Sequence, residues 1–327
     1  MAAVESALIG PRVEFHRRDQ LALDDNVLAA LVYGAASPAI DDARIIHVGL
    51  ATADGGPAVE LWRTAGVVRT DVSGPIRCAI QGDFLFGCLE IHEREHGGML
   101  AAVEAAYRML LEFQQRQPQR HLLRVWNHLD AINEGEGDLE RYRQFCIGRA
   151  RGLGDMKAER LPAGTAVGRR DRTGLLQICW LAGRRPGRPV GNPRQIQAYQ
   201  YPRQHGPTPP SFSRAMLLPN DELMGSGTAS IVGHESLHGG NLEAQIDETL
   251  TNLRELCRAG DRMIAHAQRA NRGDAAVAVK VYLRRGETAP AAAARILAGL
   301  PGAKSLLLLE ADICRRELLV EIECTWA

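Results

Sequence analysis

Two histidines and a glutamate within residues 92–96 have the types and spacing of a zinc protease site. The stretch "HEREH" matches the H-E-x-x-H pattern, in which both histidines bind one metal ion and the glutamate activates water. That chemistry requires an α-helix, because only helical spacing places both histidines on one face. The preceding "GDFLFGCLEI" predicts a buried strand, however, and two glycines follow the motif directly. We therefore expect a strand-to-helix turn here.

The same pattern occurs a second time further along the chain. "HESLHGGNL" at 234–242 matches "HEREHGGML" at 92–100 in both histidines, the glutamate, both glycines and the leucine, at an offset of 234 − 92 = 142. One duplicated structural unit explains this better than two separate zinc sites. The motif therefore predicts an internal repeat and no metal site. We keep His234 as a second-rank candidate for the functional site.

Length and composition bound the class of protein. A chain of 327 residues is long enough for two domains of about 150 residues each. Lys plus Arg and Asp plus Glu both number 39, so no overall field attracts nucleic acid or an anionic membrane. The longest apolar runs fall far short of the roughly 20 residues of a membrane span, and the N-terminus lacks a secretory signal pattern. Seven scattered cysteines favour neither disulfides nor zinc. We expect a cytoplasmic protein.

Hydrophobic periodicity predicts a similar order of elements in two halves, residues 1–185 and 186–327. Helices are expected at 97–116, 138–153, 241–260 and 289–300. Strands are expected at 43–53, 58–68, 83–91, 121–129, 174–182, 198–201, 227–233, 276–285 and 318–327. The parallel endings "LLQICWLA" and "LLVEIECTWA" extend the repeat. Each half should form a mixed β-sheet with two helices packed on it, which gives an α+β fold.

Longer motifs in the chain resemble the chorismatases. They are "RVWNHLDAIN", "RYRQFCIGRA", "YQYPRQHGPTPPSFSRA" and "GTASIVGHESLHGG", while "LLVEIECTWA" resembles the closing strand of the RidA/YjgF-like fold. The resemblance implies two fused RidA/YjgF-like halves with a cleft beside the second half. It implies release of pyruvate from the small molecule chorismate, with no metal or organic cofactor, and it is compatible with a monomer or a small homo-oligomer.

The substrate that this resemblance implies can be compared with the residue types in the motifs. Chorismate is a dianion with an enolpyruvyl ether, so its site needs cations for two carboxylates. Arginine suits this task because its planar fork matches both carboxylate oxygens. The candidates are Arg124, Arg149, Arg203 and Arg214, with Arg149 and Arg214 ranked first. Tyr199 and Tyr201, two apart on an expected strand, should face one side and offer hydroxyl groups to a carboxylate.

The acid that protonates the ether is expected to be Glu321. Strand alternation places Glu321 and Glu323 on one face of the last strand, away from an apolar layer. A carboxyl group in a buried cleft keeps its proton to higher pH, as a general acid requires. In the chorismatases the donor is a glutamate six residues before the end, and 327 − 6 = 321. Glu323 better fits a solvated edge-strand position.

Two further positions bear on the product. In the family a cysteine seven residues before the acid, with a glycine in the "SGTAS" segment, marks the branch that forms 3-hydroxybenzoate, whereas alanines mark hydrolysis. Here 321 − 7 = 314 is Cys314, and the glycine is Gly227. A polarisable thiol beside the ring could assist ring opening or proton removal, and a glycine lets the ring sit closer. Both positions therefore predict 3-hydroxybenzoate.

Several alternatives stay open at this point. Within the family, these are a 4-hydroxybenzoate or mixed product, or hydrolysis to a dihydroxycyclohexadiene carboxylate. A RidA-like imine hydrolase would share the closing glutamate, but it should carry an arginine on the strand before the final hairpin, where residues 303–313 hold none. A non-catalytic protein that binds an aromatic or keto acid would use the same arginines but would not need a protonated Glu321.

Overall fold

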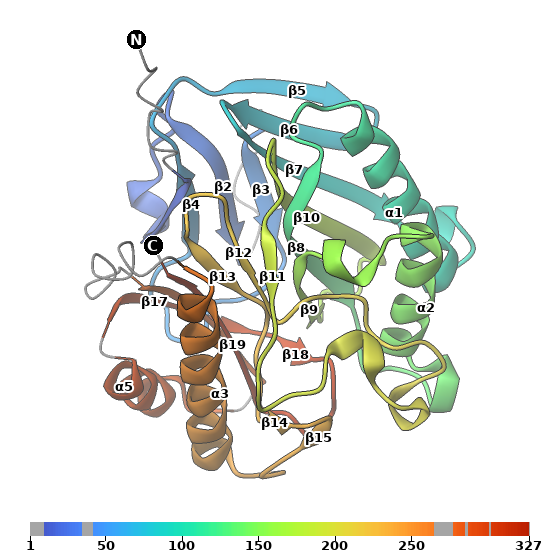
Figure 1. Ribbon diagram of the computed structural model, residues 1–327, viewed down its shortest axis with the longest axis vertical. Coiled ribbons are helices and arrows are strands. Elements are labelled where there is room, and N and C mark those ends of the chain that lie inside the picture. The colour runs from blue at the N-terminus through green and yellow to red at the C-terminus, as the bar shows by residue number, and fades with distance from the viewer. Residues whose placement is uncertain (1–9, 35–41, 265–276, 285–286, 301, 327) are drawn as a thin grey trace.

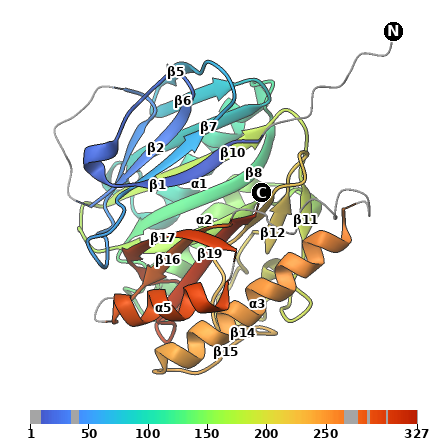
Figure 2. The ribbon, with the colours of Figure 1, turned by 90° about the vertical axis from the view of Figure 1, so that its left-hand side faces the viewer.

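The computed structural model describes residues 10–34, 42–264, 277–284, 287–300 and 302–326. Within these ranges, sheets of four, seven and six strands surround a shared apolar core to which all three contribute side chains (Figures 1 and 2). Helices pack on the two larger sheets, so the expected α+β class is confirmed. None of the helices in these ranges has the length and apolarity needed to cross a membrane.

The smallest of these sheets is N-terminal. Its strands are β1 (Arg12–His16), β2 (Val27–Tyr33), β3 (Ile45–Val48) and β4 (Val59–Arg63), in the spatial order β1-β4-β2-β3. Strands β2 and β3 are parallel, and the other pairs are antiparallel. The sequence predicted strands near β3 and β4 but missed β1 and β2, although every residue of β2 is buried.

The seven-stranded sheet forms most of the first half. Its order is β18-β9-β8-β10-β7-β6-β5, with β5 (Arg69–Ser73), β6 (Ile76–Gln81), β7 (Phe84–His92), β8 (His121–Asp130), β9 (Ala163–Arg169), β10 (Leu175–Gly183) and β18 (Asp312–Ile313). Helices α1 (Met99–Gln115) and α2 (Arg141–Leu153) share one apolar core with this sheet. The edge strand β18 comes from the far end of the chain, so the two halves are joined within one sheet.

The six-stranded sheet forms most of the second half. Its order is β11-β12-β13-β19-β16-β17, with β11 (Arg188–Val190), β12 (Ala215–Leu217), β13 (Leu223–Gly225), β16 (Val277–Leu283), β17 (Ala303–Glu310) and β19 (Val320–Trp326). Helices α3 (Leu242–Arg262) and α5 (Ala289–Gly299) pack on one face, and Figure 2 shows β16, β17 and β19 between these helices and the N-terminal strands. A small hairpin joins β14 (Ile231–Val232) and β15 (Glu235–Ser236).

The two halves repeat one topological unit, as the duplicated motif predicted. In each half a strand leads through a turn into a long helix, and two parallel strands then flank a second helix: β8 and β9 around α2, and β16 and β17 around α5. The division of the chain at residue 185 falls between β10 and β11 and stays a prediction.

The first copy of the histidine motif lies in a strand-to-helix turn, which confirms that expectation. His92 ends β7, and Glu93–Glu95 form a short 3-10 helix before α1. The Glu93 carboxylate is buried and lies 2.6 Å from Arg141 Nη2, so it acts in an ion pair between the turn and α2. Gly97 and Gly98 both adopt positive φ, which allows the chain to turn into the helix.

Two expected strands in the second half were wrong or incomplete. Residues 198–200 form a 3-10 helix instead of a strand. The 227–233 stretch contributes only the short β14 and two isolated bridges, one between Thr228 and Ile322 and one between Gly233 and Gln195. Prolines at 202, 207, 209 and 210 follow the first of these segments and interrupt ladder hydrogen bonding, so the chain forms a loop there.

Close contact between α1 and α2 fixes the position of α2. A Cβ atom added at Gly148 would lie 2.4 Å from the backbone oxygen of Leu100. One added at Gly152 would lie 2.5 Å from Tyr107 Cβ. Glycine at these two positions therefore allows the helix backbones to approach closely.

We predict that Gly148→Ala lowers the free energy of unfolding by about 1–3 kcal/mol, because the new methyl group must displace the backbone of α1. The gain of about 1 kcal/mol in helix propensity offsets only part of this cost. Urea denaturation followed by circular dichroism gives the measurement. Arg151→Ala, an exposed change on the same helix, should stay within about 0.5 kcal/mol of wild type. A Gly148→Ala protein as stable as wild type would contradict the close-contact explanation.

Candidate active site

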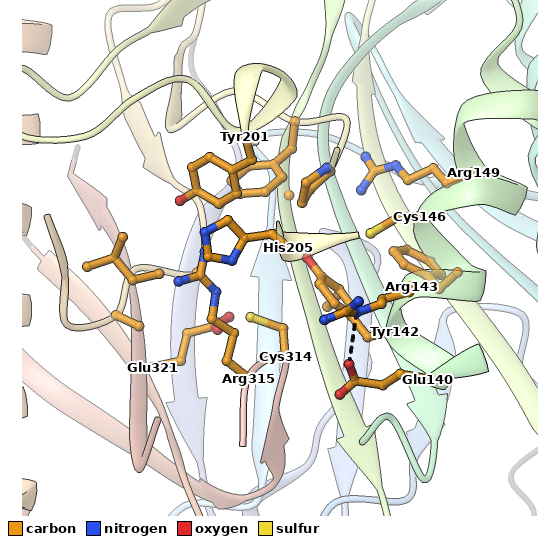
Figure 3. Close-up of a pocket in the computed structure, with 18 of the residues that line it drawn as sticks. Glu140, Tyr142, Arg143, Cys146, Arg149, Tyr201, His205, Cys314, Arg315 and Glu321 are labelled. Atoms are coloured by element: carbon orange, nitrogen blue, oxygen red, sulfur yellow. Dashed lines mark ion pairs between the residues drawn. The ribbon is translucent and has the colours of Figure 1, made fainter. Parts of the chain in front are cut away.

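A cavity of about 590 Å³ lies where the two halves meet. Helix α2 and strand β9 line one side, and the loop 201–214, the start of β19 and the hairpin 314–317 line much of the rest. Figure 3 shows Cys146 and Arg149 entering from α2, with Glu321, Cys314 and Arg315 on the opposite side. Residues more than 150 positions apart in the sequence therefore share one site.

The structure brings six of the expected site residues to this cavity and leaves four outside its lining. Those that line it are Arg149, Tyr201, Arg214, Gly227, Cys314 and Glu321. The four that do not line it are Arg124, Tyr199, Arg203 and His234. Tyr199 packs with the apolar core of the seven-stranded sheet. The expectation that Tyr199 and Tyr201 share a strand face was wrong, because they lie on a 3-10 turn.

Arg203 and Arg124 are engaged in ion pairs elsewhere. Arg203 is exposed at the surface, where its Nη2 lies 2.5 Å from Asp138. Arg124 is buried behind the cavity wall, where it pairs with Glu323 and donates a 2.5 Å hydrogen bond to Thr165 Oγ1. Both guanidinium groups already have anionic partners, which makes them less available to a ligand.

Glu321 is a buried acid at the base of the cavity. It lies on β19, between β13 and β16, and only 4% of its surface is exposed. Burial and then the negative charge of Glu323 raise the pKa of Glu321 to about 8, against a lowering by Arg124. The opposite-facing residues of β19 pack with the core beneath α3, as strand alternation predicted. At neutral pH the Glu321 carboxyl group therefore holds a proton that it can donate into the cavity.

Glu323 is not the solvated edge-strand residue that the sequence suggested. It is only 6% exposed, because β19 is a central strand. Burial alone would raise its pKa, but Lys280 and Arg124, with hydrogen bonds from Tyr282 and Trp126, lower the pKa of Glu323 to about 2. The two glutamates on one face of β19 are thus held in opposite protonation states.

Two buried guanidinium groups border the cavity with unused donors. Arg149 is 3% exposed, and its Nε and Nη2 lack hydrogen-bond partners among the described residues. It is held by stacking over the Tyr107 ring, 5.1 Å from the centroid. Arg214 is 5% exposed and donates to the Tyr201 hydroxyl at 2.7 Å, while its Nε has no partner among these residues. Buried cations with free N–H groups are suited to binding carboxylates.

Arg315 is a further cavity cation, which was not among the residues expected from the sequence. Its guanidinium stacks over the Tyr201 ring at 5.2 Å and donates to the backbone oxygen of His234 at 2.8 Å. Its Nη2 is buried without a partner in the described part of the chain. The "CRRE" stretch predicted only a hairpin, and nothing local distinguishes Arg315 from its exposed neighbour Arg316.

The histidine of the second motif lies just behind the cavity rim. His234 Nδ1 lies 3.1 Å from His205 Nε2 and 3.0 Å from Glu235 Oε1. His205 lines the cavity, and burial and then Arg315 lower its pKa to about 4, so it is neutral at pH 7. The ligand atoms of His205, His234 and Glu235 lie within 4.8 Å of one another, which is close enough to hold a metal ion.

Cys314 and Gly227 both adjoin the acid. Burial and then Glu321 raise the pKa of Cys314 to about 12, so this group is a neutral thiol at pH 7. A Cβ atom added at Gly227 would lie 1.8 Å from Glu321 Oε1 and 3.1 Å from Thr165 Oγ1. A glycine at 227 is therefore what gives the Glu321 carboxyl group its room.

Comparison with known proteins identifies the family. Residues 60–182 match the family model described as chorismatase FkbO/Hyg5-like, N-terminal. A 3-hydroxybenzoate synthase of Streptomyces hygroscopicus is 34% identical over 279 residues, which covers 82% of this chain and 81% of that protein. A chorismatase of the same organism is 31% identical over 310 residues, 92% of this chain and 89% of that protein. A crystal structure of a chorismatase superimposes with a TM-score of 0.83 at 29% identity, covering 97% of this chain and 98% of the other. The resemblance seen in the sequence is confirmed, and the chain belongs to the chorismatase family.

Proposed function

We propose that this protein is an enzyme that converts chorismate into 3-hydroxybenzoate and pyruvate. The observation that carries the proposal is a protonated, buried Glu321 that faces a cavity bordered by Arg149 and Arg214. The similarity to a 3-hydroxybenzoate synthase supports the substrate and the product. A protein that only bound the substrate would gain nothing from a carboxyl group held in its acid form.

Two buried cations that line the cavity can receive the two carboxylates of chorismate. Arg149 enters from α2, and Arg214 enters from the loop next to Tyr201. Each guanidinium can donate to one of the two carboxylates, and the Tyr201 hydroxyl can add a hydrogen bond near Arg214. Because both cations are already buried and held by aromatic rings, little additional ordering is needed when the dianion binds.

Glu321 then donates its proton to the methylene carbon of the enolpyruvyl ether. The ether oxygen becomes part of an oxocarbenium ion, which makes the pyruvyl group a good leaving group. The neighbouring ring hydroxyl displaces it, so that the carbon–oxygen bond from the ring to the pyruvyl group breaks as a new one forms. The bond from that oxygen to its original ring carbon then breaks, and loss of the proton from the carbon that now bears the oxygen gives the aromatic product. A proton returns to Glu321 and restores its acid form. All atoms of chorismate are thus divided between hydroxybenzoate and pyruvate, and no water is consumed.

Cys314 and Gly227 favour this route over hydrolysis. The neutral thiol of Cys314 occupies space beside the acid where a water molecule would otherwise reach the oxocarbenium ion. Gly227 allows the carboxyl group of Glu321 to lie against the segment 226–228, with the ring close to the acid. The product is thus determined by which nucleophile can approach the activated ether.

We predict that Glu321→Gln lowers kcat by about 10²–10⁴-fold, because the amide cannot protonate carbon. KM should change little, since the cations that bind the carboxylates remain. Chorismate loss followed by absorbance gives the rate. Glu317→Gln, which changes an exposed carboxylate at the cavity rim, is the matched control and should stay close to wild type. Full activity in Glu321→Gln would eliminate this residue as the acid.

We expect kcat/KM to fall about tenfold per pH unit above pH 8. The proton donor must be in its acid form, and the pKa of Glu321 is raised to about 8, so the active fraction is complete below this value and declines above it. Initial rates from pH 6 to 10 at low chorismate concentration measure this limb. An alkaline limb beginning near pH 5, the range of an ordinary carboxyl group, would contradict the assignment.

For Cys314→Ala we expect the product to shift from 3-hydroxybenzoate toward dihydroxycyclohexadiene carboxylate. The smaller side chain leaves room for water beside Glu321, so that hydrolysis competes with displacement. Cys146→Ala removes another thiol that lines the same cavity and serves as the control, with the wild-type product expected. Chromatographic separation of the products gives the ratio. Identical ratios in both variants would show that Cys314 does not direct the outcome.

A further inference from the structure

Glu321 lies beside a row of buried charged side chains that crosses all three sheets. Glu323 faces the same side of β19, because side chains alternate along a strand. Its carboxylate pairs with Arg124 of β8 and with Lys280 of β16, whose Nζ lies 3.2 Å from Glu323 Oε1. Lys280 Nζ also lies 2.7 Å from Glu60 Oε2 of β4, in the N-terminal sheet.

The row is shielded from solvent and closely hydrogen-bonded. The side chains of Lys280 and Glu60 are 4% and 3% exposed, and those of Arg124 and Glu323 are 1% and 7% exposed. Aromatic side chains donate the remaining hydrogen bonds: Trp126 (2.8 Å) and Tyr282 to Glu323, and Tyr33 (2.6 Å) and Trp62 (3.0 Å) to Glu60. Such a desolvated row is costly unless its charges are matched.

The four charges of the row cancel. Glu60 and Glu323 contribute two negative charges, and Arg124 and Lys280 contribute two positive charges. An ionised Glu321 would add a fifth, unmatched charge to this buried region, about 7 Å from Glu323 along the strand. A neutral carboxylic acid at position 321 avoids that cost. The balance of the row therefore favours the protonated form of Glu321.

We propose that Glu323 is a positioning residue that keeps Glu321 protonated, and that Glu60 of the N-terminal sheet takes part by balancing Lys280. This inference rests on the proposed function, in which Glu321 is the acid. It gives the N-terminal sheet a role in the reaction, although Glu60 does not line the cavity.

Three of the other titratable groups near the row and Glu321 are neutral at pH 7. Burial, and to a lesser degree Glu321, raises the pKa of both Tyr142 of α2 and Cys314 of the hairpin, so both are neutral at pH 7. His128 of β8 is also neutral, because burial and then Lys280 lower its pKa to about 3. Arg315 lies beside Cys314, on the cavity side of the hairpin.

The test uses two variants with opposite charge effects. Infrared difference spectra over a pH series report the carboxylic acid band of Glu321, which is identified by its loss in Glu321→Gln and requires no turnover. Glu323→Gln leaves the row with excess positive charge and should lower the pH at which this band disappears by about one to two pH units. Lys280→Met leaves the row with excess negative charge and should raise the pH at which the band disappears. The alkaline limb of kcat/KM should move in the same directions.

Three further variants separate charge from structural damage. Glu323→Asp keeps the charge and should keep the wild-type titration. Glu60→Gln should move it in the same direction as Glu323→Gln but less, because Glu60 is more distant. Combining Glu60→Gln with Lys280→Met restores the balance and should return the titration toward wild type. If Glu323→Gln does not fold, the opposite titration shifts expected for Glu60→Gln and Lys280→Met still test the proposal.

Shifts of the same sign in the Glu323→Gln and Lys280→Met variants, or an unchanged titration in the folded variants, would overturn the proposal. The two hypotheses fail in different ways. If Glu321→Gln keeps full turnover while the infrared titration moves as expected, the proposed function is wrong but the control of the Glu321 proton stands. If Glu321→Gln is inactive and the titration does not move, only this inference fails.

Discussion

The carboxyl group of Glu321 must keep its proton inside the protein, although the nearby cation Arg124 favours the ionised form. The rest of the site depends on this constraint. Arg124 lies close enough to lower the pKa of Glu321, and an unpaired guanidinium at that place would hold Glu321 as a carboxylate. The structure gives Arg124 other partners, namely Glu323, Thr165 and the Val125 carbonyl oxygen. Burial then dominates at Glu321, and the acid form persists at neutral pH.

The duplicated architecture explains how one site is built from two similar halves. Each half has two parallel strands around a helix, yet only α2 contributes Arg149 and other polar residues to the cavity. The equivalent helix α5 has the sequence "APAAAARILAG" and packs with the core of the six-stranded sheet. In the second half β19, the hairpin before it and the loop 201–214 contribute. The halves have kept the fold, but different elements of each half supply the residues of the site.

Much of this could be predicted from sequence, because periodicity and motif order are local signals. Four helices of the described residues, the repeat and the alternation of Glu321 with apolar neighbours on β19 all follow from side-chain spacing. The wrong or missing predictions concern residues whose surroundings depend on contacts between segments far apart in the sequence. Glu323 looks like an edge-strand residue until β13 and β16 are placed on either side of β19. Arg124 appeared available for substrate because its partner Glu323 is 199 positions away, and Arg315 becomes recognisable only when the hairpin folds over Tyr201.

The most direct measurement is to incubate the purified protein with chorismate and to quantify pyruvate, 3-hydroxybenzoate, 4-hydroxybenzoate and dihydroxycyclohexadiene carboxylate by chromatography against standards. We predict equimolar pyruvate and 3-hydroxybenzoate, because the ring hydroxyl displaces the protonated ether within the cavity. Unchanged chorismate would rule out the proposed activity, and the buried arginines would then have to be explained as the binding site of another dianion. Dihydroxycyclohexadiene carboxylate as the main product would retain Glu321 as the acid and reject the role given to Cys314 and Gly227.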